Sequence, residues 1–303
     1  MDIPKKTLQN GFSLPVYGIG TWHMGGIMTE SHQNDAIEIQ AIKDALDAGV
    51  THIDTAEMYG NGHAEELIHD ALQGRDRSKI FITSKVKPNH FKYDDVLSAA
   101  ERSLKRLGTD YLDLYLLHMP NPDIDIKETM RAMDRLKQDG MIRNIGVSNF
   151  SLERYKLAQD ATRNKIVVNQ MLYNLNERFI EETKLLDYAL KEDFLIVAYT
   201  PVHKGAYDAD QLQILKQIAK KYGKSVTQIA LNWITSQTNV VTISKTTSKE
   251  HLEENLGSFD FTMDEEDRKT LQSDFPHHRN GAFYDSALKY RLVSFGNSLF
   301  KRK

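Results

Sequence analysis

The chain has 303 residues, a formal charge of −3 (39 Lys and Arg against 42 Asp and Glu) and no cysteine. The near-balance of charge argues against a general nucleic-acid binder, because displacing the counterions of a nucleic acid requires an excess of cations. Without cysteine the chain has no disulfide framework, no thiolate nucleophile and no Cys-ligated metal. Its 40% hydrophobic and 27% charged residues are typical of a globular protein.

The sequence offers no recognisable targeting or membrane segment. Residues 1–6 lack the apolar core of a signal peptide. The longest apolar run, at residues 194–199, is far short of the ~18 residues that span a bilayer. We therefore expect a soluble cytoplasmic protein that has no membrane partner and no nucleic-acid partner.

The chain opens with the pattern of a β-hairpin. Two short runs, residues 7–9 and 12–14, flank the pair Asn10-Gly11. Asn-Gly is the pair best able to adopt the positive φ angles of a two-residue turn. A hairpin is therefore expected over residues 5–15.

Beyond the hairpin, short apolar runs alternate with longer amphipathic stretches. One amphipathic stretch has apolar residues from Val96 to Leu107 on one face and stops at Gly108. A helix from about residue 211 to 222 is followed by an additional one, which Ser225 begins with Gln228 as its capping-box partner. The predicted strands cover residues 16–20, 52–54, 80–84, 112–117, 142–147, 165–169, 194–198 and 240–243.

Alternating strands and helices predict a parallel sheet, and eight strands in about 240 residues favour closure into a (β/α)8 TIM barrel. An open doubly wound sheet is the alternative, but Gly18-Ile19-Gly20 lacks the third glycine of its phosphate-binding turn. We expect a single barrel domain over residues 1–303. It includes the hairpin, the extra helices and a tail over residues 275–303, which contains His277-His278-Arg279 and lies on the surface or over the barrel mouth.

In barrels of this kind the active site lies at the carboxyl ends of the strands. Every predicted strand ends in hydrogen-bonding residues, and Tyr59 follows the second strand by five residues. Leu116, Leu117, Ile82 and Ile145 are expected to fill the interior below them. The strand-end residues are Thr21 and Trp22, Asp54, Lys85, His118, Ser148 and Asn149, Asn169 and Gln170, Tyr199 to Pro201, and Ser244 to Thr246.

Four of these residues predict carbonyl chemistry. The Tyr59 phenol has an ordinary pKa of ~10, which a neighbouring Lys85 cation would lower. Asp54 could hold Lys85 charged and oriented, and His118 could donate a hydrogen bond to a carbonyl oxygen. Together they would polarise a carbonyl and protonate the alkoxide that forms when a hydride reaches its carbon.

Three other interpretations use the same residues. Asp54 and Lys85 could be a structural ion pair at the rim. His52 and Asp54 could bind a metal, but no third ligand with suitable spacing is evident, so we expect no metal. Lys85 could form a Schiff base, which would leave Tyr59 and the other rim residues without a role.

Three separated segments resemble the aldo-keto reductase family. Residues 49–59 (GVTHIDTAEMY) look like its first signature, residues 102–120 (RSLKRLGTDYLDLYLLHMP) like its second, and Gly146-Val-Ser-Asn-Phe150 like a third block. The similarity extends from Gly18 to about Phe261. It implies an (α/β)8 barrel, a nicotinamide dinucleotide cofactor, and a catalytic tetrad of Asp54, Tyr59, Lys85 and His118.

The resemblance also implies a cofactor site, which begins at Gly20 and Thr21 and includes Asp54. Ser148, Asn149 and Gln170 match the residues that hold the nicotinamide carboxamide, Tyr199 matches its stacking ring, and Thr200, Pro201 and Val202 match part of the pyrophosphate loop. Ser244, Lys245 and Thr246 replace the usual Pro-Lys-Ser, His251 stands where the family has Arg, and Glu254 and Asn255 match its adenine-binding pair.

Lys245 and Thr246 can still bind a 2′-phosphate, so NADP(H) is favoured. The imidazole of His251 in place of a guanidinium weakens that case, which leaves NAD(H) as the alternative. Trp22 is expected to line the substrate pocket with Tyr59 and His118, and His23, Met24 and Met119 could lie nearby. The sequence thus predicts an NADP-dependent oxidoreductase that reduces a small aldehyde or ketone. The alternative is a non-catalytic redox sensor that binds the nicotinamide cofactor on the same barrel.

Overall fold

The computed structural model describes residues 3–202 and 205–276, and the residues from His277 onward, including His278 and Arg279, lie outside it. Eight parallel strands form a closed barrel in the order β10-β3-β4-β5-β6-β7-β8-β9. This confirms the predicted barrel and rules out the open sheet. The strands are β3 (Tyr17–Gly20), β4 (His52–Asp54), β5 (Phe81–Val86), β6 (Leu114–Leu117), β7 (Ile145–Ser148), β8 (Ile166–Leu172), β9 (Leu195–Tyr199) and β10 (Val240–Ser244).

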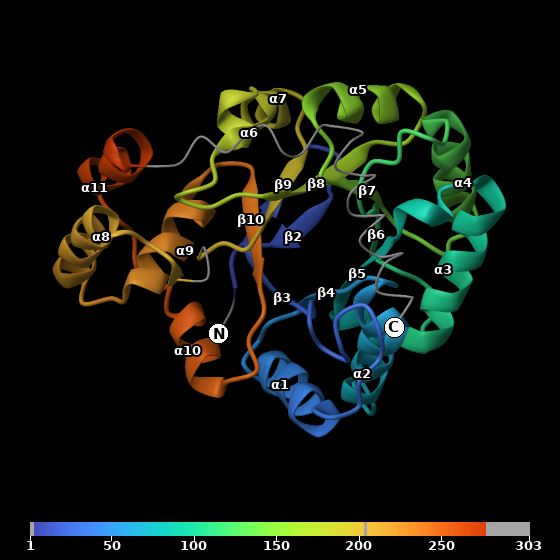
Figure 1. The fold of residues 1–303 in the computed structure, drawn as a ribbon, viewed down its shortest axis with the longest axis horizontal. Coiled ribbons are helices and arrows are strands. Elements are labelled where there is room, and N and C mark those ends of the chain that lie inside the picture. The colour runs from blue at the N-terminus through green and yellow to red at the C-terminus, as the bar shows by residue number, and fades with distance from the viewer. Residues whose placement is uncertain (1–2, 203–204, 277–303) are drawn as a thin grey trace, which may run out of the picture.

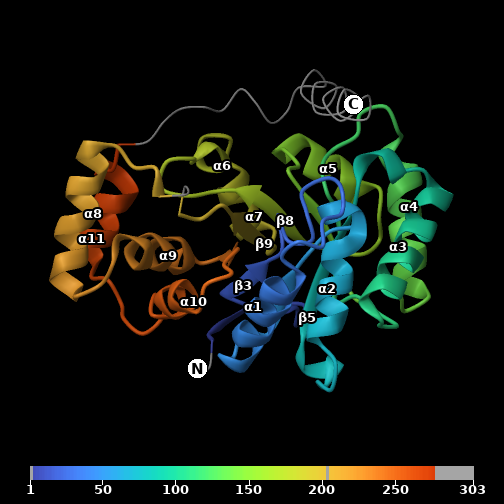
Figure 2. The same ribbon diagram turned by 60° about the horizontal axis from the view of Figure 1, so that its bottom comes forward.

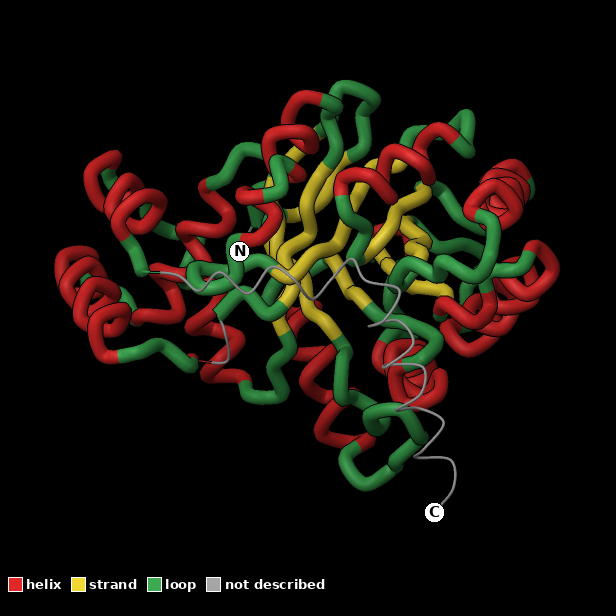
Figure 3. The backbone as a smooth tube through the Cα atoms, turned by 45° about the horizontal axis from the view of Figure 1, so that its top comes forward, coloured by secondary structure: helices red, strands yellow, loops and turns green. Residues whose placement is uncertain are grey.

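Helices surround the barrel, as Figures 1 and 3 show. Two helices separate β9 from β10, as predicted, and both begin with a complete capping box, at Asp208 and at Ser225. The helices are α1 (Asp35–Asp47), α2 (His63–Ala71), α3 (Tyr93–Leu107), α4 (Ile126–Gln138), α5 (Leu152–Asp160), α6 (Phe179–Glu182), α7 (Leu185–Lys191), α8 (Ala209–Tyr222), α9 (Val226–Ser236), α10 (Lys249–Leu256) and α11 (Glu265–Lys269).

The strand alternation decides which side chains enter the barrel, since successive residues point to opposite faces. Leu114 and Leu116 of β6 belong to the apolar cluster inside the barrel, whereas Leu117 packs in the layer between the strands and the helices. Ile82 and Ile145 are also in that outer layer. The prediction that all four residues fill the interior was therefore right for Leu116 and wrong for the other three.

The N-terminal hairpin closes the amino end of the barrel. β1 (Lys5–Thr7) pairs antiparallel with β2 (Ser13–Pro15). Leu8 and Phe12 are buried in the same cluster as the interior leucines and valines. The turn is longer than the two residues predicted: Gly11 alone of the Asn10-Gly11 pair has a positive φ, and Leu8 bonds across the loop to Phe12. The need to bury two apolar side chains explains the longer loop.

At the end of the described chain, residues pack on the outside of the barrel. In Figures 1 and 2, α8 and α11 lie side by side, and Lys221 of α8 forms ion pairs with Asp264 and Asp267. Phe275 is buried against the Tyr207 ring. Within the described ranges, no helix is both long and apolar enough to cross a membrane.

Candidate active site

A layer of eight residues lies at the carboxyl end of the barrel. Each strand contributes one of them, either from near its carboxyl end or, for β6 and β10, the residue that directly follows the strand. In β6 every second residue points into the barrel, so the side chains of Leu114, Leu116 and then His118 lie on the inner face. The same alternation holds along the other strands. The layer comprises Gly20, Asp54, Lys85, His118, Ser148, Gln170, Tyr199 and Lys245. A cavity of about 670 Å³ opens above it, a size suited to a small molecule or part of a cofactor.

Lys85 and Asp54 form a fully buried ion pair at the base of this cavity. The Nζ atom of Lys85 lies 2.5 Å from Oδ1 of Asp54 and 2.8 Å from the carbonyl oxygen of Thr55. Burial disfavours the ammonium, but the Asp54 carboxylate and the Tyr59 oxygen outweigh it and raise the pKa of Lys85. Lys85 therefore stays charged at neutral pH. Because a Schiff-base lysine must be a neutral nucleophile, this environment argues against that role.

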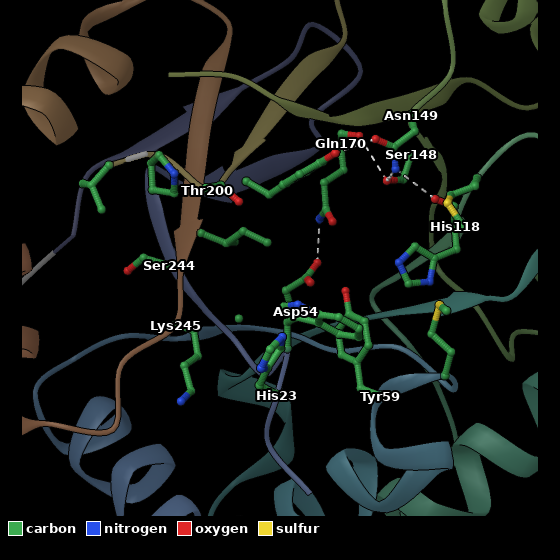
Figure 4. Close-up of a pocket in the computed structure, with 18 of the residues that line it drawn as sticks. His23, Asp54, Tyr59, His118, Ser148, Asn149, Gln170, Thr200, Ser244 and Lys245 are labelled. Atoms are coloured by element: carbon green, nitrogen blue, oxygen red, sulfur yellow. Dashed lines mark hydrogen bonds between the residues drawn. The ribbon is translucent and has the colours of Figure 1, made fainter. Parts of the chain in front are cut away.

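Tyr59 sits where the ion pair meets the cavity. Its hydroxyl accepts a hydrogen bond of 3.2 Å from Lys85, and the side chain is only 8% exposed. Figure 4 shows this hydroxyl directed into the cavity beside the His118 ring, whose centroid is 5.5 Å from that of Tyr59. Tyr59 begins a short turn, Tyr59–Gly62, that leads into α2.

The net pKa of Tyr59 differs from the sequence expectation. Burial raises the pKa of the phenol above its ordinary value of 10.0, and Asp54 acts in the same direction. Lys85 lowers it, as predicted, but does not overcome the effect of burial. The phenol is thus protonated at neutral pH, which is the state a proton donor requires.

His118 is neutral in this environment. Burial and then the positive charge of Lys85 lower its pKa well below 6.5. Its Nδ1 atom is buried and has no hydrogen-bond partner among the described residues. A neutral imidazole can still donate one N–H, so His118 can bind a carbonyl oxygen without competing for the proton.

A chain of hydrogen bonds fixes the amide side chains on the far side of Asp54. Gln170 donates from Nε2 to Oδ2 of Asp54 at 2.7 Å. Asn149 donates to the Ser148 hydroxyl at 3.0 Å and accepts from the Tyr199 hydroxyl at 2.8 Å. These contacts orient a hydroxyl, two amides and an aromatic ring around one part of the cavity, as Figure 4 shows for the labelled polar residues.

The backbone is strained at three residues that line the cavity. His23, Asn149 and Thr200 have φ angles of 70°, 61° and 56°, in the left-handed region that favours glycine. Such conformations persist where the surroundings impose them and are common at binding sites. Gly20, at the end of β3, leaves room in the cavity. A Cβ built there would contact only Ile243, at 3.7 Å.

His52 lies one layer below Asp54, inside the barrel. Its Nε2 atom is 3.0 Å from the Thr83 hydroxyl, and burial, reinforced by Lys85, lowers its pKa to about 3. Its ring also fills the space that a side chain at position 18 would need, since a Cβ on Gly18 would come within 2.5 Å of Nδ1. His52 thus packs the interior and does not line the cavity with Asp54, contrary to the metal-site interpretation.

Most of the predicted site residues surround the cavity, and several do not. Thr21 is fully buried, with its hydroxyl donating to the Asp54 carbonyl. Asn255 donates to the hydroxyls of Tyr17 and Ser244. His251 and Glu254 belong to α10, with His251 exposed, and Thr246 bonds to the Ser248 carbonyl. The lining residues among the predictions are Gly20, Trp22, His23, Asp54, Tyr59, His118, Met119, Ser148, Asn149, Gln170, Tyr199, Thr200, Pro201, Val202, Ser244 and Lys245.

The sequence interpretation did not identify Met28, Met58 and Ile243 as lining residues. Met58 directly precedes Tyr59, so adjacency could have suggested it, whereas Met28 reaches the cavity through the conformation of a long loop. Met24, which was expected near the pocket, is buried in the core instead. Its position in a turn, with its backbone bonded to Thr21, directs it inward.

Comparisons with known proteins agree with this architecture. A model of the Aldo/keto reductase family matches residues 17–273. The chain is 35% identical to methylglyoxal reductase YeaE of Escherichia coli, over 87% of this chain and 92% of the relative. It is also 35% identical to the glyoxal reductase of Bacillus subtilis, over 88% and 91% of the two chains.

Solved structures give the same result. A thermostable aldo-keto reductase in complex with the inhibitor epalrestat is 41% identical with a TM-score of 0.88, over 89% of this chain and 99% of that one. An aldo/keto reductase from Klebsiella pneumoniae in complex with NADP and acetate is 33% identical with a TM-score of 0.82, over 94% and 100%.

The chain belongs to the aldo-keto reductase family. This confirms the predicted family and class, an oxidoreductase acting on carbonyl groups. The named relatives are reductases, which supports the enzyme over the redox-sensor alternative.

Proposed function

We propose that this protein uses NADPH to reduce small reactive aldehydes, with 2-oxoaldehydes such as methylglyoxal and glyoxal as the preferred class. The substrate class is supported by the two curated relatives named for these compounds. The cofactor is supported by the NADP-containing neighbour and by the chemistry of the cavity wall. We place the activity in the cytoplasm, where the cofactor is kept reduced.

The observation that carries the proposal is a protonated phenol between a buried cation and an open cavity. The Tyr59 hydroxyl is 3.2 Å from the charged Nζ of Lys85, which is itself held by Asp54. When the phenol gives up its proton, the phenolate gains the full attraction of that ammonium in a site of low dielectric. Lys85 therefore stabilises the product of proton transfer more than its starting state.

The residues divide the work in the following way. His118, neutral, donates an N–H to the carbonyl oxygen and orients it towards Tyr59. Tyr59 gives its proton to this oxygen as negative charge develops there, and Lys85 and Asp54 stabilise the phenolate that remains. When bound, the reduced nicotinamide supplies the hydride that the carbonyl carbon accepts.

The side chains beside Asp54 fit a nicotinamide. The Ser148 hydroxyl and the amides of Asn149 and Gln170 offer both donors and acceptors, which a carboxamide requires. The Tyr199 ring, fixed by its bond to Asn149, supplies a flat apolar surface for stacking. The open space above Gly20 lets a flat ring approach the ends of β3 and β10.

The wall of the cavity near Tyr59 suits a small carbonyl compound. Trp22 packs on Tyr59 with ring centroids 4.8 Å apart, and Met28, Met58 and Met119 complete the apolar lining. His118 and Tyr59 offer their polar groups to a single oxygen at its base. A short substrate with an exposed carbonyl therefore reaches the acid without burying other polar groups unpaired.

The direct test is NADPH oxidation, followed by absorbance, with methylglyoxal, glyoxal and a panel of simple aldehydes. We expect turnover with the 2-oxoaldehydes at a kcat/KM at least tenfold above that for unsubstituted aldehydes of the same length. Turnover of the panel without this preference would retain the reductase and reject the proposed substrate class. Tight NADPH binding without any turnover would instead favour the sensor.

A further inference from the structure

A second cluster of chemically active side chains lies outside the cavity, where the loop after β3 meets the first turn of α2. It consists of His32 in that loop, Asp35 at the start of α1 and His63 at the start of α2. The candidate ligand atoms of these three residues all lie within 4.8 Å of one another. In Figures 1 and 2, α1 and α2 run side by side, so the cluster joins two neighbouring elements.

The contacts within the cluster are hydrogen bonds between groups that could also ligate a metal ion. One oxygen of Asp35 is 2.9 Å from Nδ1 of His32, and the other is 2.9 Å from Nε2 of His63. Ligand atoms around a tetrahedral zinc ion at ~2.0–2.1 Å are separated by about 3.3 Å. Each 2.9 Å contact would therefore widen by about 0.4 Å, and the two histidine nitrogens, which lie within 4.8 Å of each other, would take up the same separation around the ion.

Glu66 completes the arrangement from outside. Its Oε2 atom is 2.8 Å from Nδ1 of His63, which leaves Nε2, the atom facing Asp35, as the ligating nitrogen. A carboxylate that holds the far nitrogen of a histidine is the usual support of a metal-bound imidazole. His63 is only 7% exposed, so this orientation is also fixed by packing.

We propose that His32, Asp35 and His63 bind a divalent transition-metal ion of the zinc type, with Glu66 orienting His63 and water completing the coordination. Two imidazoles and one carboxylate suit zinc or nickel and not the oxygen-seeking calcium or magnesium. The site lies apart from the cavity and is independent of the proposed substrate class. It is a structural site, and no step of carbonyl reduction uses it.

The position of the cluster gives the ion a defined effect. The loop between β3 and α1 carries Trp22, His23 and Met28 of the cavity wall. It is already held by hydrogen bonds from Gly25 to Glu38 and from Gly60 to Ile27. An ion bound by His32 and His63 would tie this loop to the segment that follows Tyr59, and so fix the substrate wall relative to the proton donor.

The test is calorimetric titration of tag-free, chelator-treated protein with zinc chloride, together with thermal unfolding. We expect one ion per chain, a dissociation constant in the micromolar range, and a Tm about 3–6 °C higher at a hundredfold excess over that constant. Cobalt(II) bound in place of zinc should give the visible absorption bands of a four-coordinate, tetrahedral site. Because binding displaces protons from histidine, the affinity should rise between about pH 6 and pH 7.5.

Variants separate this site from adventitious binding. His32→Gln changes an exposed side chain and keeps the fold, and we expect it to weaken zinc binding at least thirtyfold, with Glu66→Gln weakening it about tenfold. Two control variants should bind zinc as tightly as the wild type does. The first is His69→Gln, which lies on α2 with His63 but outside the cluster, and the second is the double variant His277→Gln/His278→Gln. The proposal would be overturned if His32→Gln bound zinc as tightly as the wild type, or if the wild type bound no zinc at concentrations below about 1 mM.

Discussion

Lys85, which is fully buried, and Lys6, which is partly buried, lie at opposite ends of the same barrel and differ in their partners. Lys85 faces a carboxylate and a phenol, and its pKa is raised. Lys6, in the hairpin that closes the amino end, donates to the backbone carbonyls of Thr235, Gln237 and Val240, and partial burial lowers its pKa to about 8.

The difference sets apart the ammonium that we propose to assist proton transfer. At the amino end the ammonium satisfies carbonyl groups at the end of α9 and the start of β10, and no acidic side chain of the described residues pairs with it. At the carboxyl end a similar ammonium is held charged by Asp54 and lies against a group that can lose a proton. Burial to some degree is therefore found at both ends, whereas the acidic partner beside an open cavity is found at the carboxyl end, where we propose the active site.

The largest effect is expected from the acid itself. Tyr59→Phe removes the proton donor while keeping the ring that packs on Trp22, so we expect kcat/KM to fall by about 10²–10⁴-fold. NADPH binding, measured by fluorescence quenching, should stay within about twofold of wild type. Unchanged carbonyl reduction would exclude Tyr59 as the acid.

A paired substitution tests the two lysines directly. Lys85→Met leaves Asp54 buried without its cation, which should cost about 3–5 kcal/mol of unfolding free energy and abolish most activity. Lys6→Met removes a donor from three carbonyl groups and should cost about 1–3 kcal/mol while kcat changes little. Urea unfolding and initial rates measure both. Equal activity losses in the two variants would contradict the division between the ends.

The pH dependence of stability sharpens the contrast. The pKa of Lys6 is about 8 in the folded chain, below its ordinary value of 10.5. Between these values the unfolded chain binds more protons, so the unfolding free energy rises with pH. We expect wild type to gain about 1–2 kcal/mol over Lys6→Met from pH 8 to 10.5, with solvent screening keeping the gain below the full linkage value. A constant difference would show that Lys6 does not titrate in this range.

The smallest expected effect is at the exposed edge of the active end. His251→Arg restores a permanent charge near the predicted 2′-phosphate position, so NADP should bind about three- to tenfold more tightly, with NAD changed less. Dissociation constants for both cofactors, from fluorescence titration, measure this. The same change in both constants would indicate that position 251 does not contact the 2′-phosphate.

The sequence predicted the barrel and the layer of strand-end residues, because strand alternation and strand termini are local patterns. It placed the starts of β6 and β7 too early: Leu112 and Ile142 form only an isolated bridge before the continuous strands begin. It also placed Leu117, Ile82 and Ile145 on the wrong side of the sheet, because an apolar run that is buried on both faces does not reveal which face is inside.

Other features depend on long-range packing and could not be read from the chain. The ion pair between the buried Glu65 and the partly buried Arg106 joins α2 to α3 across 41 positions. Met28 reaches the cavity through a loop whose path no local motif determines. The net pKa of Tyr59 depended on the balance between burial and a single cation, and that balance requires the three-dimensional surroundings. The catalytic and cofactor-binding roles of the site residues stay predictions, those of Thr246, His251, Glu254 and Asn255 among them. The assignment of residues 1–303 to one domain is a prediction as well.

The methionines of the cavity wall have a consequence for the durability of the enzyme. Met28, Met58 and Met119 give the wall flexible thioethers that can adjust to carbonyl compounds of different shapes. The chain has no cysteine, so the reactive aldehydes that we propose as substrates would find no thiol to alkylate. Oxidative damage at this wall would instead form methionine sulfoxide, a lesion that cells can reverse.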